Sequence, residues 1–130
     1  MQDFNAARLA LSGAFLACLV GVAGPAAAGG DAAAGQVLFT GKCGLCHAPV
    51  EGQNKIGPSL WGVVGRKAGT LATYTYSDAM KGANRTWDAT TLDDYLTAPR
   101  EKIPGVKMIF AGLPEASDRQ NIIAYLSTLK

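Results

Sequence analysis

Residues 42–50 read KCGLCHAPV, and this stretch decides how the rest of the chain folds. Cys43 and Cys46 are separated by two residues, and His47 follows directly after the second cysteine. The chain of 130 residues contains only this one histidine. Two cysteines and a histidine in this spacing indicate a redox, metal or cofactor site, so the function depends on what the site binds.

Three kinds of site are compatible with the spacing. A dithiol redox motif needs a strand followed by a helix, and no such sheet is visible in the sequence. A zinc site needs four nitrogen or sulfur ligands, whereas the chain after residue 28 offers only these three. In a c-type haem site, the cysteines bind the haem vinyl groups and the histidine binds the iron. We favour haem, because two intervening residues bring both sulfurs to one edge of the porphyrin.

The first 28 residues have the three parts of a secretory signal peptide. A polar start with Arg8 precedes an apolar run over 9–22, and small residues follow, with an A-x-A-like cut site at 26–28. The apolar run is shorter than the roughly 20 residues of a membrane-spanning helix. We therefore expect residues 1–28 to be cleaved, with an uncleaved anchor as the alternative.

Cleavage leaves one domain, residues 29–130, and removes Cys18. The expected compartment is oxidising, and we predict the periplasm. The composition is 48% hydrophobic and 17% charged, and the net charge is only +2 at pH 7. These values predict a folded domain with no nucleic-acid partner. The short apolar run of the signal segment predicts no stable insertion into a membrane.

The mature sequence predicts a few short helices. Asp31 is placed to cap a helix that runs to about Lys42. A second helix is expected to start at Thr90 or Thr91, with Pro99 beyond its end. The remaining elements are a single helical turn after Ser77 and a last helix for which Ser117 and Gln120 form a capping box.

Long loops without a repeating apolar pattern connect these helices, over 47–76 and 100–114. No pair of strands is convincing, so the predicted fold is all-α. Loops of this length inside a compact domain usually serve a function or surround something. A domain of about 100 residues has a modest core, and we expect it to wrap around one large apolar cofactor.

A haem iron bound by His47 needs a second ligand, and no other histidine exists. Met108 lies in a Pro–Gly loop whose extended backbone can follow the opposite haem face, and we predict it as that ligand. Met80 is the other methionine of the mature chain, either a core residue or a competing ligand. Iron with two strong protein ligands has no position for oxygen or peroxide. The chain is therefore predicted to transfer electrons, not to be an enzyme.

Several segments occur in the order found in soluble class I cytochrome c: KCGLCH (42–47), GPSLWGVVGRKAG (57–69), YTYSDAM (74–80), YLTAP (95–99), IPGVKMIFAG (103–112) and IIAYL (122–126). The chain resembles mitochondrial cytochrome c and its bacterial periplasmic relatives over essentially the whole mature domain. The resemblance implies a small class I cytochrome c fold around one covalent haem c. It also implies Cys43 and Cys46 as thioether sites, His47 as proximal ligand and Met108 as distal ligand.

The resemblance implies supporting roles for further residues. The Pro58 carbonyl would accept the second N–H of His47, and Tyr95 would contact the methionine sulfur. Gly35, Phe39 and Tyr125 would form the contact between the terminal helices. Three more residues would donate hydrogen bonds to the haem propionates: Arg66, Tyr76 and Trp87.

Two positions depart from the family pattern beside the haem. Val106 stands where many relatives have a threonine, and Met80 stands where relatives often have an asparagine. Both changes remove a polar side chain, so we predict a drier distal side and a reduction potential at or above the family norm. Part of the lysine ring that steers acidic partners is retained, although Glu101 interrupts it; the ring members are Lys42, Arg100, Lys102 and Lys107.

The predicted function is a monomeric periplasmic electron carrier of a respiratory chain. Its expected partners are a cytochrome bc-type complex, a terminal oxidase, a photosynthetic reaction centre or a periplasmic dehydrogenase. One alternative is a haem sensor or peroxidase-like enzyme with a dissociable Met108. Another is a membrane-tethered carrier that keeps its signal segment.

Overall fold

The computed structural model describes residues 29–130, so the predicted signal peptide, its cut site and Cys18 lie outside the described residues. In the described part, the regular secondary structure is helical, with one isolated β-bridge between Lys67 and Thr86. The all-α prediction is therefore correct. The helices are α1 (Ala32–Lys42), α2 (Asp78–Lys81), α3 (Ala89–Thr97), α4 (Pro99–Lys102) and α5 (Ala116–Leu126).

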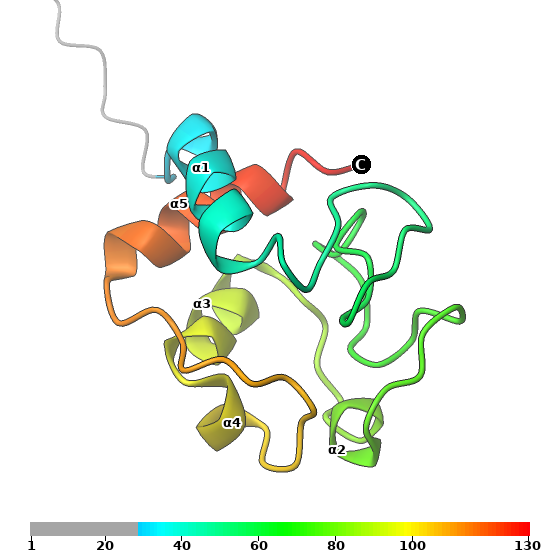
Figure 1. Ribbon diagram of the computed structural model, residues 1–130. Helices are drawn as coiled ribbons and strands as arrows, with labels where there is room; N and C mark the ends of the chain where they lie inside the picture. The colour runs from blue at the N-terminus through cyan, green and yellow to red at the C-terminus, as the bar shows by residue number, and fades with distance from the viewer. Residues whose placement is uncertain (1–28) are drawn as a thin grey trace, which may run out of the picture.

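Helices α1 and α5, from opposite ends of the described chain, cross at close range (Figure 1). A Cβ on Gly35 would overlap the backbone carbonyl of Asn121, so only glycine permits this approach. The rings of Phe39 and Tyr125 pack at a centroid distance of 5.3 Å. The predicted contact between the terminal helices is thus confirmed.

The starts of the helices test the predicted caps. Asp31 caps α1 by accepting hydrogen bonds from the amides of residues 33 and 34, as predicted. Helix α3 starts at Ala89, slightly before the predicted threonines, because Asp88 and Thr91 form a reciprocal capping box.

Two predictions about the second half of the chain were wrong. The segment after Ala98 was predicted as loop, yet it contains α4, because Pro99 at the first helical position has a φ suited to a helix and lacks only an unneeded N–H. The predicted capping box of Ser117 and Gln120 is absent. Helix α5 starts at Ala116, so Ser117 already lies inside the first turn.

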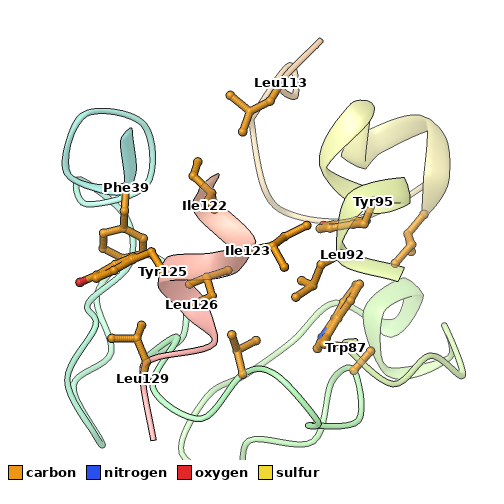
Figure 2. Close-up of a cluster of buried hydrophobic side chains, with 13 residues drawn as sticks. Phe39, Trp87, Leu92, Tyr95, Leu113, Ile122, Ile123, Tyr125, Leu126 and Leu129 are labelled. Atoms are coloured by element: carbon orange, nitrogen blue, oxygen red, sulfur yellow. The ribbon is translucent and has the colours of Figure 1, made fainter. Parts of the chain in front are cut away.

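The core lies between α5, α3 and the segment before α3 (Figure 2). Ile123 of α5 points toward Leu92 and Tyr95 of α3 (Figure 2), and Ile122 and Leu126 of α5 are also buried. The long loop 43–77 occupies one side of the molecule, and α3 and α4 lie on the other (Figure 1). Within residues 29–130, each helix is too short or too polar to cross a bilayer.

Candidate functional site

The CGLCH segment forms a helical turn directly after α1. The amides of Cys46 and His47 both donate to the Cys43 carbonyl, at 3.0 and 2.9 Å. Residues three apart in such a turn share a face, so Cys43 and Cys46 point to the same side. No disulfide joins Cys43 and Cys46.

The electrostatics of this turn do not suit a dithiol exchanger. Burial raises the pKa of the Cys43 thiol to about 11, and the neighbouring Cys46 adds to the shift. A thiol exchanges with disulfides as its thiolate, which such a pKa disfavours. In the described residues, no group of three or more histidine, cysteine, aspartate or glutamate side chains is arranged to hold a metal ion.

The loop at residues 57–58 fixes the ring of His47. The Nδ1 atom lies 2.7 Å from the Pro58 carbonyl oxygen, which can only accept, so Nδ1 carries the proton. The lone pair of Nε2 is then available to a metal. Burial lowers the pKa of His47, while the bond to Pro58 acts in the opposite direction, and the neutral ring is the form that ligates.

Gly57 belongs to this arrangement, although sequence reasoning did not single it out. A Cβ at this position would stand about 2.7 Å from Nδ1 of His47. The backbone of Gly57 therefore lies against the imidazole ring and limits its rotation. The signal in the sequence was the Gly–Pro pair itself, because a glycine permits close approach where a side chain cannot.

Arg66 and Trp87 are brought together by backbone pairing. The Trp87 amide donates to the Arg66 carbonyl at 2.9 Å, and the Gly65 amide donates to the Trp87 carbonyl at 2.6 Å. The guanidinium of Arg66 donates to the carbonyls of Ser59 and Trp61, at 3.0 and 3.2 Å. These bonds hold the Arg66 side chain along the loop that follows Pro58.

Tyr76 is electrostatically linked to Arg66. Burial raises the pKa of Tyr76, and the Arg66 cation opposes this shift. Its ring meets that of Tyr74 edge-on at a centroid distance of 4.9 Å. The three predicted propionate donors thus come from the adjoining loops 57–66, 74–76 and 84–88.

Tyr95 presents a buried hydroxyl without a partner. It lies on α3, is 6% exposed and packs on the Trp87 ring at 4.9 Å. Among the described residues, its Oη is the one buried side-chain polar atom with no hydrogen bond. Burial raises the pKa of Tyr95 to about 12, so the group stays protonated and can donate. A native buried hydroxyl without a partner indicates that a bound group supplies one.

Met108 lies on a loop that is fastened at its ends. Near the first end, Lys107 Nζ donates to the Thr75 carbonyl at 3.0 Å. At the far end, the Leu113 amide donates to the Leu96 carbonyl at 2.7 Å. Between these points, half-buried apolar side chains pack against the core, as do others from neighbouring loops; the set includes Leu60, Met80, Val106, Met108 and Phe110.

This set of residues fits a haem. The site offers two thiols on one face of a turn, a neutral imidazole with a free Nε2, a donor hydroxyl without a partner and half-buried apolar side chains. Haem offers vinyl groups to the thiols, iron to the imidazole and a broad apolar ring, and the thioether-linked product is haem c. A hollow of about 490 Å³ lies elsewhere on the molecule, between α3, α5 and residues 29–30, and none of the candidate haem-binding residues lines it.

The predicted ring of cations is weaker than its sequence suggests. Lys102 Nζ donates to Asp94 Oδ1 at 2.5 Å, and the other oxygen of Asp94 accepts from Arg85 at 2.9 Å. Asp94 therefore offsets part of the charge of Lys102, because its single negative charge is shared with Arg85. Lys42, Arg100 and Lys107 remain exposed members of the ring.

Comparisons with known proteins agree with this site. A family model described as cytochrome c matches residues 32–130. A cytochrome c2 from Rhodoblastus acidophilus is 52% identical over 102 residues, which are 78% of this chain and 94% of the relative. The solved structure of cytochrome cH from Methylobacterium extorquens has a TM-score of 0.72 and 45% identity, covering 76% of this chain and 99% of the other.

A third relative is longer than this chain. The cytochrome c-type protein cyt cy of Rhodobacter capsulatus is 49% identical over 105 residues, which are 81% of this chain. The match spans about half of that relative's length, 52%.

Proposed function

The chain belongs to the cytochrome c family, and from that premise we propose that it moves single electrons between larger redox complexes of the periplasm, with His47 and Met108 as the ligands of its iron. As a member of this family it is an electron-transfer protein, not an enzyme, and carries one covalently attached haem c. The haem supplies the reversible one-electron change of its iron.

The chain's own residues have separate tasks in this proposal. Cys43 and Cys46 attach the cofactor, and His47 binds its iron through Nε2. The observation that carries the proposal is the 2.7 Å bond from His47 Nδ1 to the Pro58 carbonyl, which sets the tautomer and orientation of the ring. Met108 is the distal ligand, since it is the half-buried methionine of the loop fastened at Lys107 and Leu113.

The supporting residues keep water away from the haem and donate hydrogen bonds to its charged and polar groups. Tyr95 donates its unpartnered hydroxyl to the distal sulfur. Val106 and Met80 are half-buried apolar side chains packed against the core, and beside the haem they would favour the less charged ferrous state. Arg66, Tyr76 and Trp87 supply the donors that partly buried propionates need.

Ligand binding tests the closed site. Carbon monoxide added to the ferrous protein is expected to leave its visible spectrum unchanged, because His47 and Met108 would both ligate the iron. A prompt spectral change, or a high-spin ferric spectrum at neutral pH, would instead support a sensor or peroxidase-like protein.

The periplasmic assignment has its own test. We expect export with cleavage after residue 28, so that mass spectrometry of the protein isolated from its source finds Gly29 at the N-terminus. An intact N-terminus on a membrane-bound protein would replace this proposal with a tethered carrier.

A further inference from the structure

The peptide bond between Pro58 and Ser59 carries a hydrogen bond on each of its two polar atoms. Its carbonyl oxygen, from Pro58, accepts from Nδ1 of His47 at 2.7 Å. Its N–H, from Ser59, donates to the side-chain oxygen of Asn54 at 2.9 Å. These groups therefore form one chain of hydrogen bonds that runs from Asn54 through the backbone to the imidazole of His47.

The partners of Asn54 fix which end of its amide faces Ser59. The nitrogen Nδ2 donates to the Thr73 carbonyl at 2.8 Å and to the Thr73 hydroxyl at 3.2 Å. A backbone carbonyl can only accept and a backbone N–H can only donate, so the reverse orientation of the amide would break the bonds to the Thr73 carbonyl and to Ser59. Asn54 thus presents its oxygen to Ser59 while its nitrogen is held by the loop that contains Thr73.

Ser59 has little freedom to move away from this position, because it is only 2% exposed and every one of its polar atoms has a partner. Its hydroxyl donates to the Val50 carbonyl at 2.6 Å, and its carbonyl accepts from Arg66 at 3.0 Å. Asn54 is the partner of the remaining atom, the N–H. Loss of the Asn54 oxygen would leave the N–H of a buried residue without its acceptor.

Hydrogen bonds in such a chain polarise one another. A peptide whose N–H is bonded has a more negative carbonyl oxygen, and neighbouring bonds strengthen each other by roughly 10–30%. A stronger bond from the Nδ1–H of His47 raises the basicity of Nε2, the atom that would ligate iron. A more basic imidazole stabilises the ferric state relative to the ferrous state, and the reduction potential falls.

We propose that Asn54 is a positioning residue for the proximal ligand: its side-chain oxygen, acting through the peptide between Pro58 and Ser59, strengthens the bond to His47 and lowers the reduction potential. The proposal rests on the electron-carrier function with His47 as a ligand. It adds to that function a residue that reaches the iron only through two hydrogen bonds and one peptide group.

The first test compares the midpoint potentials of haem-loaded variants by redox titration. Asn54→Leu keeps the approximate size of the side chain and removes its oxygen. We expect the ferrous-to-ferric ratio at the parent's midpoint to rise about two- to threefold, equal to about 20–30 mV for one electron. Asn54→Ala removes the same oxygen and gives the same test if the loop does not accommodate leucine.

Two further variants separate the acceptor from simple bracing of the loops. Tyr74→Phe removes the 2.8 Å bond from Tyr74 Oη to the Ile56 carbonyl, which joins the same two loops but does not involve the peptide after Pro58. It should lower stability without moving the potential. Asn54→Asp keeps an oxygen acceptor for the Ser59 N–H, so its potential should lie at or below that of the parent.

The Nδ1 proton of His47 reports on the bond itself. In the diamagnetic ferrous protein, a weaker hydrogen bond moves the nuclear magnetic resonance of this proton upfield. Asn54→Leu should move the resonance upfield, and Tyr74→Phe should leave it at the position found in the parent.

The proposal is overturned if Asn54→Leu and Asn54→Ala both keep the parent's potential and His47 resonance. It is also overturned if Tyr74→Phe or Asn54→Asp raises the potential as much as Asn54→Leu does. Either result would leave the carrier function intact, provided that the parent gives a reversible one-electron wave at an electrode. A parent without such a wave would contradict the carrier function, and this proposal with it.

Discussion

Replacing Arg119 by methionine tests the part of the fold that holds the end of the Met108 loop. Arg119 lies on α5 and is 9% exposed, a rare degree of burial for a cation. Its Nε donates to Asp93 Oδ1 on α3, and its Nη1 donates to the carbonyls of Leu113 and Pro114, each at 2.8 Å. One side chain thus joins α5, α3 and the loop that follows Met108.

The expected cost follows from the partners that the substitution leaves behind. The carboxylate of Asp93 is 43% exposed, so water can replace the arginine there and this pair contributes at most about 1 kcal/mol. The bond to the Leu113 carbonyl is buried, and a buried acceptor left without a donor costs about 1–3 kcal/mol. Methionine keeps the apolar packing of the stem. Arg119→Met should therefore destabilise the protein by about 1–4 kcal/mol, at roughly 4–8 °C of Tm per kcal/mol in a domain of this size.

The assay is thermal unfolding of the ferric haem-loaded protein, followed by far-ultraviolet circular dichroism. Arg100→Met is the control, because Arg100 is exposed and forms no ion pair within residues 29–130, so its change should stay below about 0.5 kcal/mol. Asp93→Asn should cost less than Arg119→Met. The reasoning fails if Arg119→Met has the same Tm as the parent, or if Asp93→Asn lowers the stability as much as Arg119→Met does.

Three other predictions concern the haem site and the surface charges. Gly57→Ala places a methyl group against the His47 ring, and we expect a much lower yield of haem-loaded protein, measured by absorbance per milligram, whereas a normal yield would show that the ring has room to move. Lys102 and Arg85 hold the pKa of Asp94 below its usual value, so the carboxylate contributes stability above its unfolded-state pKa that is lost as pH falls through the folded-state pKa. Asp94→Asn should accordingly be less stable than the parent at pH 7 and equally stable at strongly acidic pH, and urea titrations with a pH-independent difference would contradict this. Val106→Thr and Met80→Asn should each lower the midpoint potential by about 20–60 mV, the equivalent of one net hydrogen bond to the oxidised state, and a redox titration that places either variant above the parent would exclude this effect.

The features that could be predicted from the sequence are those set by residues close together in the chain. Asp31 caps α1 because its carboxylate reaches amides two and three residues later, a local contact that needs no tertiary information. The glycine at position 35 could be placed at a helix contact through the family resemblance. The start of α5 was misjudged because Ser117 and Gln120 have the spacing of a capping box, and nothing local shows that the helix begins at Ala116.

Contacts between distant segments could not be read from the sequence. The ion pair of Lys102 and Asp94 depends on the angle between α3 and α4, and α4 itself was not predicted. The same holds for the bonds of the Asn54 side chain, which reach the Ser59 amide and also Thr73, nineteen residues away. Tyr95 could be named from the resemblance, but its lack of a hydrogen-bond partner follows only from the packing around α3.

The near-infrared spectrum of the ferric protein tests the proposed axial ligands most directly, because a methionine sulfur on ferric haem gives a charge-transfer band in this region. The parent and Met80→Leu are expected to show the band, and Met108→Leu is expected to lose it. A band that survives Met108→Leu, or that disappears in Met80→Leu, would contradict ligation by His47 and Met108.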